Sequence, residues 1–305
     1  MTMARPTSLS FQVGARKLFA VKRSLVRVPV SLNEALEGRL PSLPPLPEAA
    51  QGYVVTSLPV DRLDAMVYAS GRMTRFVRQD YTRYFADLTG AYDAYLAKLS
   101  GNARQGVRRK AKKVAQASGG AIDVRRYRTP AELETFHAVA RGIAARTYQE
   151  KLLGEGLPGS PEFVRHMLAR GEADEVRAWL LYIGDAPAAY LYCPAQGDTL
   201  IYEFVGHDPA FNELSPGAVL QMEAFRDLFD EGRFARFDFT EGEGQHKRQF
   251  STGGVACLDL LLLQPTLTNR ATMAALGGFN RAVAGGKALA QIAGAEKLAR
   301  KLRRG

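Results

Sequence analysis

A Ser-Pro-Gly triplet, Ser215 to Gly217, separates a predicted strand from a predicted helix. The first turn of a helix has unpaired N–H groups and a partial positive charge, so it suits a phosphate. Ser and Pro are also common at ordinary helix starts, where Ser caps the helix and Pro takes the first helical position. We therefore expect Ser215 and Gly217 either to contact a phosphorylated ligand or simply to begin the helix.

Two carboxylates and a histidine lie at the ends of predicted strands. Asp238 stands between two phenylalanines, so a semi-buried carboxyl with a raised pKa could act as a general base. It could equally orient Lys247 or pair with an arginine. Glu203 and His207 bracket the end of another strand, and a histidine with an ordinary pKa near 6.5 can take a proton from an ammonium group. The alternatives are a solvent-facing Glu203 and a His207 that only helps a turn.

Six basic residues crowd one predicted helix, at positions 104, 108, 109, 110, 112 and 113. Such dense like charge destabilises a helix unless an anion meets it. The candidates are ligand phosphates, tRNA, an anionic lipid or an anionic glycan, and the alternative is a solvated basic face. No aromatic residue interrupts the run, which argues against single-stranded nucleic acid read by stacking.

The net charge of +10 over 305 residues is unevenly distributed. Residues 1–33 contain six Lys or Arg and no acid, residues 98–128 contain ten and one acid, and residues 265–305 contain eight and one acid. The rest of the chain is acidic, which argues against a protein that reads a DNA groove. With 46% hydrophobic and 24% charged residues, the composition is globular and excludes a disordered chain, a collagen-like repeat or a disulfide scaffold.

Neither Cys193 nor Cys257 has a neighbour at metal-ligand spacing, so we expect reduced core residues and no metal. The start of the chain lacks an apolar secretory segment, and no stretch approaches 18 apolar residues. These patterns predict a cytoplasmic protein. The tail, 265–305, has apolar residues at helical spacing and a cationic end, so it could touch the inner face of the cell membrane or pack as a surface helix.

From residue 121 onward, the pattern predicts the order β-α-α-β-β-β-α-β-α-β. We therefore expect an α/β (α+β) fold with a mixed, mostly antiparallel sheet. The predicted strands are 122–127, 176–183, 188–193, 199–205, 234–240 and 255–263, and the predicted helices are 130–148, 160–171, 215–231 and 245–250. Before them we expect a proline-rich linker at 38–52, strands at 53–57, 65–70 and 73–88, and helices at 92–99 and 102–116.

Four segments follow from these patterns. They are a basic N-terminal extension (1–33), a smaller unit ending in the basic helix (34–120), the α/β domain (121–264) and the basic helical tail (265–305).

Three stretches resemble the GNAT acyltransferase superfamily, in its FemAB-like and CelD-like branch. They are Tyr95–Lys113, Tyr202–Gly217 and Phe237–Phe250, and with the elements between them the resemblance covers about residues 50–264. It implies transfer of an acyl group from a thioester, usually acyl-CoA or acetyl-CoA, to an amine. Relatives in the FemAB group use aminoacyl-tRNA and pack two GNAT-like units together, so 34–120 would be a reduced first unit.

The resemblance also implies roles for particular residues. Ser215 and Gly217 would cradle the donor's pyrophosphate, although the usual Q/R-x-x-G-x-G/A loop is absent. Lys247 would neutralise donor phosphate or the developing oxyanion, with a solvated lysine as the alternative, and the amine chemistry would lie near Glu203 and His207. The remaining expected contacts are Arg104 and Arg108 with donor phosphates, and Tyr202, one of several competing tyrosines, with the tetrahedral intermediate or the thiolate leaving group.

The leading expectation is an N-acyltransferase whose acceptor is a small-molecule or lipid-linked amine, in envelope, sphingolipid or exopolysaccharide synthesis. A second possibility is an aminoacyl-tRNA-dependent FemAB-type transferase, although the long helical arm of many such relatives has no counterpart here. The third is a non-catalytic basic adaptor that binds membrane or RNA. Apart from tRNA in the second case, the enzyme is not expected to bind nucleic acid.

Overall fold

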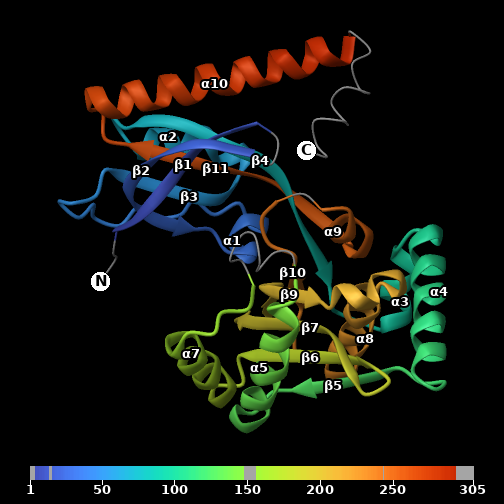
Figure 1. Cartoon of the computed structure of the whole chain (residues 1–305). Coiled ribbons are helices and arrows are strands. Elements are labelled where there is room, and N and C mark those ends of the chain that lie inside the picture. Colours follow the sequence, from blue (N-terminus) through green and yellow to red (C-terminus); the bar gives the residue numbers. More distant parts are fainter. Residues whose placement is uncertain (1–3, 14–15, 148–155, 243, 293–305) are drawn as a thin grey trace. The chain divides into compact units, whose positions relative to one another are not determined.

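The computed structural model describes four ranges of the chain (Figure 1): residues 4–13, 16–147, 156–242 and 244–292. Two compact units divide the chain between them. The first runs up to Tyr81 and resumes at Ala256, and the second comprises Thr82–Val255. Two long strands contribute residues to both units. Each unit has its own core, and each is described separately below.

The first unit contains strands in the order β1-β2-β3-β11-β4. β1 and β2 form an antiparallel hairpin, β2 runs parallel to β3, and β3 is antiparallel to β11. The elements of this unit are β1 (Ala4–Val13), β2 (Arg16–Pro29), α1 (Leu32–Leu36), β3 (Gly52–Pro59), the 3-10 helix η1 (Val60–Arg62), α2 (Leu63–Ala69), the first part of β4 (Thr74–Asp87), most of β11 (Gly253–Leu263) and α10 (Leu267–Ile292).

Two sequence-based expectations for this unit were wrong. Residues 1–33 are not merely a basic extension, because β1 and β2 pair with each other and β2 also pairs with β3. The strand expected at 65–70 is the helix α2, in which Met66 is fully buried while Tyr68 is 90% exposed. A short apolar run does not by itself distinguish a strand from a helix.

Helix α10, expected as a surface tail, packs on the strands of its own unit. Met273 and Leu276 are only 6% and 4% exposed and join a core cluster with Leu9, Phe11 and other strand residues. Their apolar surface is therefore already covered, as the packed-helix alternative requires. The cationic end of the tail, 293–305, lies outside the described residues. None of the helices that the structure describes combines the length and the apolar character needed to cross a bilayer.

The second unit contains strands in the order β4-β10-β8-β7-β6-β5, with β9 paired to β7. Most neighbours are antiparallel, and β10 runs parallel to β8, so the predicted α/β class with a mixed, mostly antiparallel sheet is confirmed. The further elements are α3 (Tyr92–Lys98), α4 (Gly101–Ala117), β5 (Asp123–Tyr127), α5 (Pro130–Ala144), α7 (Pro161–Glu172), β6 (Val176–Ile183), β7 (Ala186–Gln196), β8 (Thr199–Ile201), β9 (Phe204–His207), the 3-10 helix η2 (Pro209–Leu214), α8 (Pro216–Glu231), β10 (Arg236–Asp238) and α9 (Gln245–Phe250).

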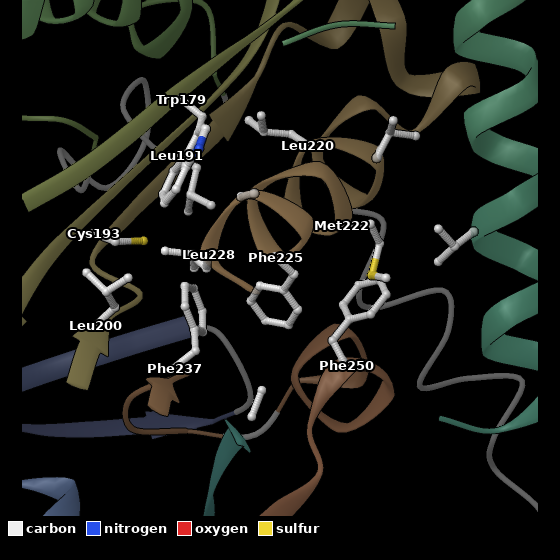
Figure 2. Close-up of a cluster of buried hydrophobic side chains, with 14 of the residues drawn as sticks. Trp179, Leu191, Cys193, Leu200, Leu220, Met222, Phe225, Leu228, Phe237 and Phe250 are labelled. Carbon is white, nitrogen blue, oxygen red and sulfur yellow. The ribbon is translucent and has the colours of Figure 1, made fainter. Parts of the chain in front are cut away.

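Helices cover both faces of the central strands β6 and β7, which explains why these strands have almost no exposed residue. Because successive side chains point to opposite faces of a strand, alternate residues join different clusters. Leu180 and Tyr192 pack with α5 and α7, whereas Trp179, Leu191 and Cys193 pack with α4 and α8. Figure 2 shows the second cluster around α8. Cys193 and Cys257 are both buried thiols, as expected for core residues.

Helices α3 and α4 belong to this second unit rather than to a separate unit at 34–120. Tyr95 is 2% exposed, and its ring packs edge-on against Phe225 of α8 with centroids 5.3 Å apart. Its hydroxyl donates a hydrogen bond to the Phe250 carbonyl oxygen at 2.9 Å. Residues 82–120 are thus integrated into the α/β body, while residues before them contribute to the other unit.

The strand predicted at 199–205 is divided into β8 and β9, and this division creates the space for the site. β8 lies between β7 and β10, whereas β9 continues on β7 and is not paired with β10. The last bond across the division joins the Tyr202 N–H to the Asp238 carbonyl oxygen at 2.9 Å. β10 ends at Asp238, so β9 has no neighbour on that side among the described strands. Residues of β9, α8 and α9 line a common cavity there.

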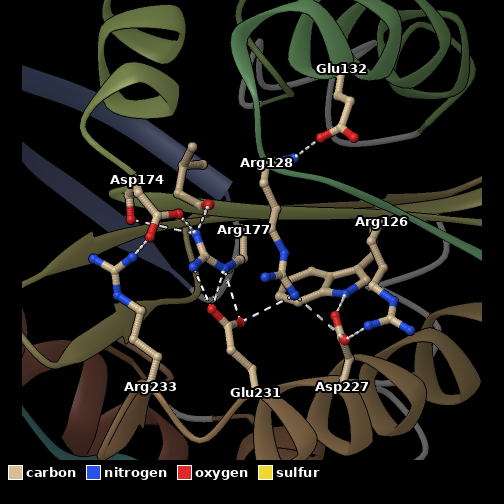
Figure 3. A network of polar contacts seen from close by, with 10 residues as sticks. Arg126, Arg128, Glu132, Asp174, Arg177, Asp227, Glu231 and Arg233 are labelled. Atoms are coloured by element: carbon tan, nitrogen blue, oxygen red, sulfur yellow. Dashed lines mark hydrogen bonds and ion pairs between the residues drawn. The ribbon is translucent and has the colours of Figure 1, made fainter.

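An ionic network around the buried side chains of Arg177 and Asp227 fixes the C-terminal half of α8 to β5 and β6 (Figure 3). Asp227 accepts a hydrogen bond from the indole N–H of Trp179 at 2.8 Å and pairs with Arg126. Glu231 pairs with Arg177, whose side chain is only 2% exposed. Because buried charges are stable only when they are paired, this network sets the position of α8 along the sheet.

Glu231 pairs with Arg177 and, at 3.4 Å, with Arg128. Arg177→Met should lower the free energy of unfolding by about 3–5 kcal/mol, because it removes the closer of these two cations from a mostly buried carboxylate. Arg125→Met, which removes an exposed pair with Asp123, should cost about 1 kcal/mol or less. Urea denaturation of both variants measures the difference. Equal losses would show that the network does not anchor α8.

Candidate functional site

A cavity of about 590 Å³ opens in the second unit where β9 leaves β10. Its walls come from β9, from the first turns of α8, from α9 and from the connecting segments. The lining residues in the described part of the chain are Thr147, Tyr202, Val205, Gly206, His207, Pro209, Asn212, Gly217, Ala218, Gln221, His246 and Phe250. None of these side chains is a lysine, an arginine or a carboxylate, so the described wall is polar in places but carries no permanent charge.

Two glycines shape the wall for different reasons. A Cβ at Gly206 would lie 2.5 Å from the ring of Tyr190, so only glycine lets β9 pack closely against β7. A Cβ at Gly217 would meet nothing within 4 Å, so the first turn of α8 presents bare backbone to the cavity. An elongated ligand can therefore approach the N–H groups at the start of this helix closely.

Ser215 occupies the N-cap position of α8, but its side chain makes no capping hydrogen bond. Its backbone is left-handed, with φ 52° and ψ 53°, a conformation that costs about 1–2 kcal/mol for a residue other than glycine. Ser215 and Pro216 therefore begin the helix at the expected positions, but without the side-chain hydrogen bond of an ordinary serine cap. The first-turn N–H groups of α8 lack this side-chain partner, although Ser215 itself is not among the cavity-lining residues.

His207 reaches the cavity from the end of β9. Its Nε2 atom lies 2.7 Å from Oδ1 of Asn212, and an amide oxygen can only accept a hydrogen bond. Nε2 therefore carries the proton in the neutral ring, and the lone pair remains on Nδ1. This tautomer can act as a proton acceptor through Nδ1.

Tyr202 and His246 form the aromatic end of the cavity, with ring centroids 5.8 Å apart. Burial raises the pKa of the Tyr202 hydroxyl, so this group stays protonated and can donate. His246 remains partly exposed, but surrounding protein and then the cation of Lys247 lower its pKa below the usual value. Near neutral pH its ring is accordingly uncharged.

Asp238 is placed away from the cavity. It is 1% exposed and forms a two-point ion pair with Arg83, with Nε–Oδ1 and Nη2–Oδ2 distances of 3.1 and 2.5 Å. It also accepts a hydrogen bond from the Thr240 N–H at 2.8 Å. The sequence left open a general base, a partner of Lys247 or a partner of an arginine, and the structure shows the pairing with an arginine. This pair joins β10 to β4 next to the cavity.

Four further predicted site residues are not among the cavity-lining residues. Glu203 is in the segment between β8 and β9, and partial desolvation raises its pKa while Arg170 opposes the rise. Lys247 donates from Nζ to the Glu241 carbonyl oxygen at 2.6 Å. Arg104 donates to the carbonyl oxygens at the C-terminus of α3, including that of Ala97 at 3.2 Å. Arg108 is exposed on α4.

The structure therefore brings Tyr202, His207 and Gly217 together and adds Gln221 and His246, which the sequence analysis did not select. Helical spacing could have identified His246. The sequence resemblance drew attention to Lys247, the residue after it. Residues four apart on a helix share a face, so the face that includes Phe250 also includes His246. His246 and Phe250 are such a pair, and both line the cavity.

The imidazole of His246 should titrate below the usual value of about 6.5, and Lys247→Gln should raise its pKa. Because the unfolded chain binds this proton more readily, the stability contributed by neutral His246 is present above pH 6.5. It should be lost as the pH falls from there toward the lower folded pKa. NMR titration of the ring measures the pKa, and His246→Asn assigns the signal. A midpoint at or above 6.5 would contradict this environment.

Known proteins resemble this chain in part of its sequence and in its fold. Residues 101–248 match the family model described as acetyltransferase (GNAT) domain. No curated protein sequence matches the chain significantly.

Three solved structures illustrate the likeness of fold. A conserved protein of unknown function from Bacteroides thetaiotaomicron VPI-5482 has a TM-score of 0.50 and 15% identity over 70% of each chain. The C-terminal DUF2156 domain of a protein assigned as a lysylphosphatidylglycerol synthetase, from Agrobacterium fabrum, has a TM-score of 0.51 and 10% identity over 74% of this chain and 71% of that chain. FemX has a TM-score of 0.49 and 10% identity over 86% of this chain and 89% of its own. At these identities, the likeness concerns the fold alone.

Proposed function

We propose, from the premise that residues 101–248 of this chain form an acetyltransferase (GNAT) domain, that the chain transfers an acyl group from a thioester such as acyl-CoA or acetyl-CoA to an amine. The family match confirms the resemblance to GNAT enzymes inferred from the sequence, while its CelD-like part stays a prediction. The observation that carries the proposal is the cavity between β9 and α8, which places a proton acceptor and a proton donor beside the first turn of α8, a turn without a side-chain cap.

The lining residues fit the successive needs of acyl transfer. The acceptor must lose a proton to become a nucleophile, and Nδ1 of His207 is the ring nitrogen left without a proton to take it. The neutral amine attacks the thioester carbonyl carbon and forms a tetrahedral intermediate. When the intermediate collapses, the carbon–sulfur bond breaks, the nitrogen gives up its extra proton and the thiolate takes one up. The protonated hydroxyl of Tyr202 can relay this proton, donating to the sulfur and regaining a proton from the nitrogen, so that it ends neutral.

The donor's phosphates have a separate requirement. The described cavity wall has no cation, so the wall itself suits the neutral arm of a coenzyme thioester. The start of α8, where no side chain caps the helix, suits phosphate. Ser215 and Gly217 remain the residues we propose for this contact. Arg104, which already caps α3, and Lys247, which bonds to a loop carbonyl, would have to change partners to join it.

We propose a small-molecule or lipid-linked amine as the acceptor and the cytoplasm as the compartment. Because Met273 and Leu276 are already packed against strands, any contact with an anionic membrane would depend on other parts of the tail. The acceptor could be found by mass spectrometry of molecules acylated when purified protein is incubated with acyl-CoA and a lipid or metabolite extract.

His207→Gln should lower kcat by about 100-fold at pH 7, because it removes the proposed base. The loss should shrink at higher pH, where the acceptor amine loses its proton without help. Release of free thiol from acetyl-CoA in the presence of the acceptor measures the rate. His166→Gln, an exposed histidine on α7, is the matched control and should behave like the wild type. A loss independent of pH would argue against proton transfer by His207.

One observation favours an aminoacyl-tRNA donor as a second candidate. Arg108, Arg109, Lys112 and Lys113 are all exposed on α4, and none of them has an ion-pair partner in the described part of the chain. A cationic helix face of this kind suits a polyphosphate backbone.

If aminoacyl-tRNA is the donor, reversing Arg109 and Lys112 to Glu should weaken its use by about tenfold or more in 150 mM salt and leave acetyl-CoA hydrolysis unchanged. Treatment with ribonuclease should then abolish transfer. Transfer from acetyl-CoA that survives both changes would instead support the thioester donor.

A further inference from the structure

Gln221 is a buried polar side chain in the cavity wall. It lies on α8 four residues after Gly217, so both residues are on the helix face that borders the cavity. Gln221 is 3% exposed, and its Nε2 atom has no hydrogen-bond partner among the described residues. Leaving such a donor unpaired costs free energy, so its presence here indicates a partner that arrives with the ligand.

This position differs from those of the other unpartnered buried polar atoms. In the described residues these are Nε of Arg62 and Oγ of Ser118, and neither residue lines the cavity. Gln221 alone combines an unpaired donor with access to a space large enough for a ligand.

The chemistry of the surrounding wall limits what the partner can be. The described lining residues include no cation that could balance a phosphate or carboxylate, and burying an unbalanced anion is costly. A neutral oxygen acceptor carries no such cost. The carbonyl oxygen of an amide, a thioester or an ester fits a carboxamide N–H donor.

We propose that Gln221 donates a hydrogen bond from Nε2 to a carbonyl oxygen of the acyl donor. This inference rests on the proposed acyl-transfer function. The carbonyl belongs to an amide in the donor's arm, to the reacting thioester, or to the ester of an aminoacyl group. All three groups offer a carbonyl oxygen as acceptor. They can be told apart because loss of the bond changes the Kd or the kcat of different probes.

Two variants separate hydrogen bonding from shape. Gln221→Met keeps a similar length but cannot donate, and Gln221→Glu offers acceptors in place of the donor. Gln105→Met, at an exposed glutamine of α4, is the matched control. The probes are CoA, acetyl-CoA and a 3′-aminoacylamino-adenosine, a stable analogue of the aminoacyl end of tRNA. Calorimetry gives the Kd values, turnover of acetyl-CoA gives kcat and KM, and thermal melting gives the Tm of each free protein.

The free Gln221→Met protein should melt at or above the wild-type Tm, because an unpaired buried donor has been removed. Ligand affinity should nevertheless fall by about tenfold, and more in Gln221→Glu. If the arm amide is the partner, CoA and acetyl-CoA weaken equally. If the thioester is the partner, the Kd of CoA stays constant while kcat for acetyl-CoA falls. If the ester is the partner, only the adenosine analogue weakens.

Three results would overturn the assignment while leaving the proposed function intact. In the first, both Gln221 variants match the wild type in Kd and kcat for every probe that the wild type uses. In the second, Gln221→Met lowers the Tm of the free protein, which would mean that the amide is bonded internally. In the third, Gln221→Glu keeps full affinity, which would make the side chain an acceptor. If the wild-type protein binds none of the probes, the proposed function and this inference both fail.

Discussion

The site depends on one backbone event, the separation of β9 from β10 after the hydrogen bond between Tyr202 and Asp238. Up to that bond, the strands form a continuous sheet whose backbone groups are satisfied by their neighbours. Beyond it, β9 is paired only with β7 among the described strands. The resulting opening is lined by β9 on one side and by α8 on the other. Because of it, the otherwise well-packed α/β body can hold an elongated ligand.

Two buried charge clusters keep this opening in place. The ion pair between Arg83 and Asp238 holds the end of β10 against β4, on the side opposite β8. The pairs of Asp227 and Glu231 hold the far end of α8 against β5 and β6. Since α8 is anchored at its C-terminal half, its first turn and the carboxamide of Gln221 are presented to the cavity on a rigid element. Rigid support of this kind is what a site needs to orient reacting groups.

Much of the fold was predictable because local patterns and burial agree. The element order after residue 121 was predicted correctly except that the single strand expected at 199–205 is divided into β8 and β9, and β6 and α9 have the predicted bounds. The failures have physical causes. α2 was mistaken for a strand because a short apolar run has no unique period, and β1 and β2 were overlooked because their cations suggested an extension.

The site was predicted less well, because side-chain direction is set by tertiary contacts. Tyr202 and His207 lie at the ends of β8 and β9, Gly217 lies in the first turn of α8, and all three were found from their position at the ends of predicted elements. Asp238 looked like a base, yet the sequence could not reveal that Arg83, 155 residues away, neutralises it. Gln221 has no chemical signature in the sequence, and His246 is indicated only by its helical spacing from Phe250. Their importance comes from the faces of α8 and α9 that they occupy, and those faces are defined only once the strands have separated.

Hydrogen exchange of the backbone with and without saturating acetyl-CoA tests most directly whether the donor binds in this opening. Binding in the opening should slow exchange of N–H groups across residues 204–221, which contain β9 and the first turns of α8. Exchange in α5 and α7, on the opposite face of the strands, should change little. Turnover of acetyl-CoA without any protection of residues 204–221 would contradict the claim that the separation of β9 from β10 forms the donor site.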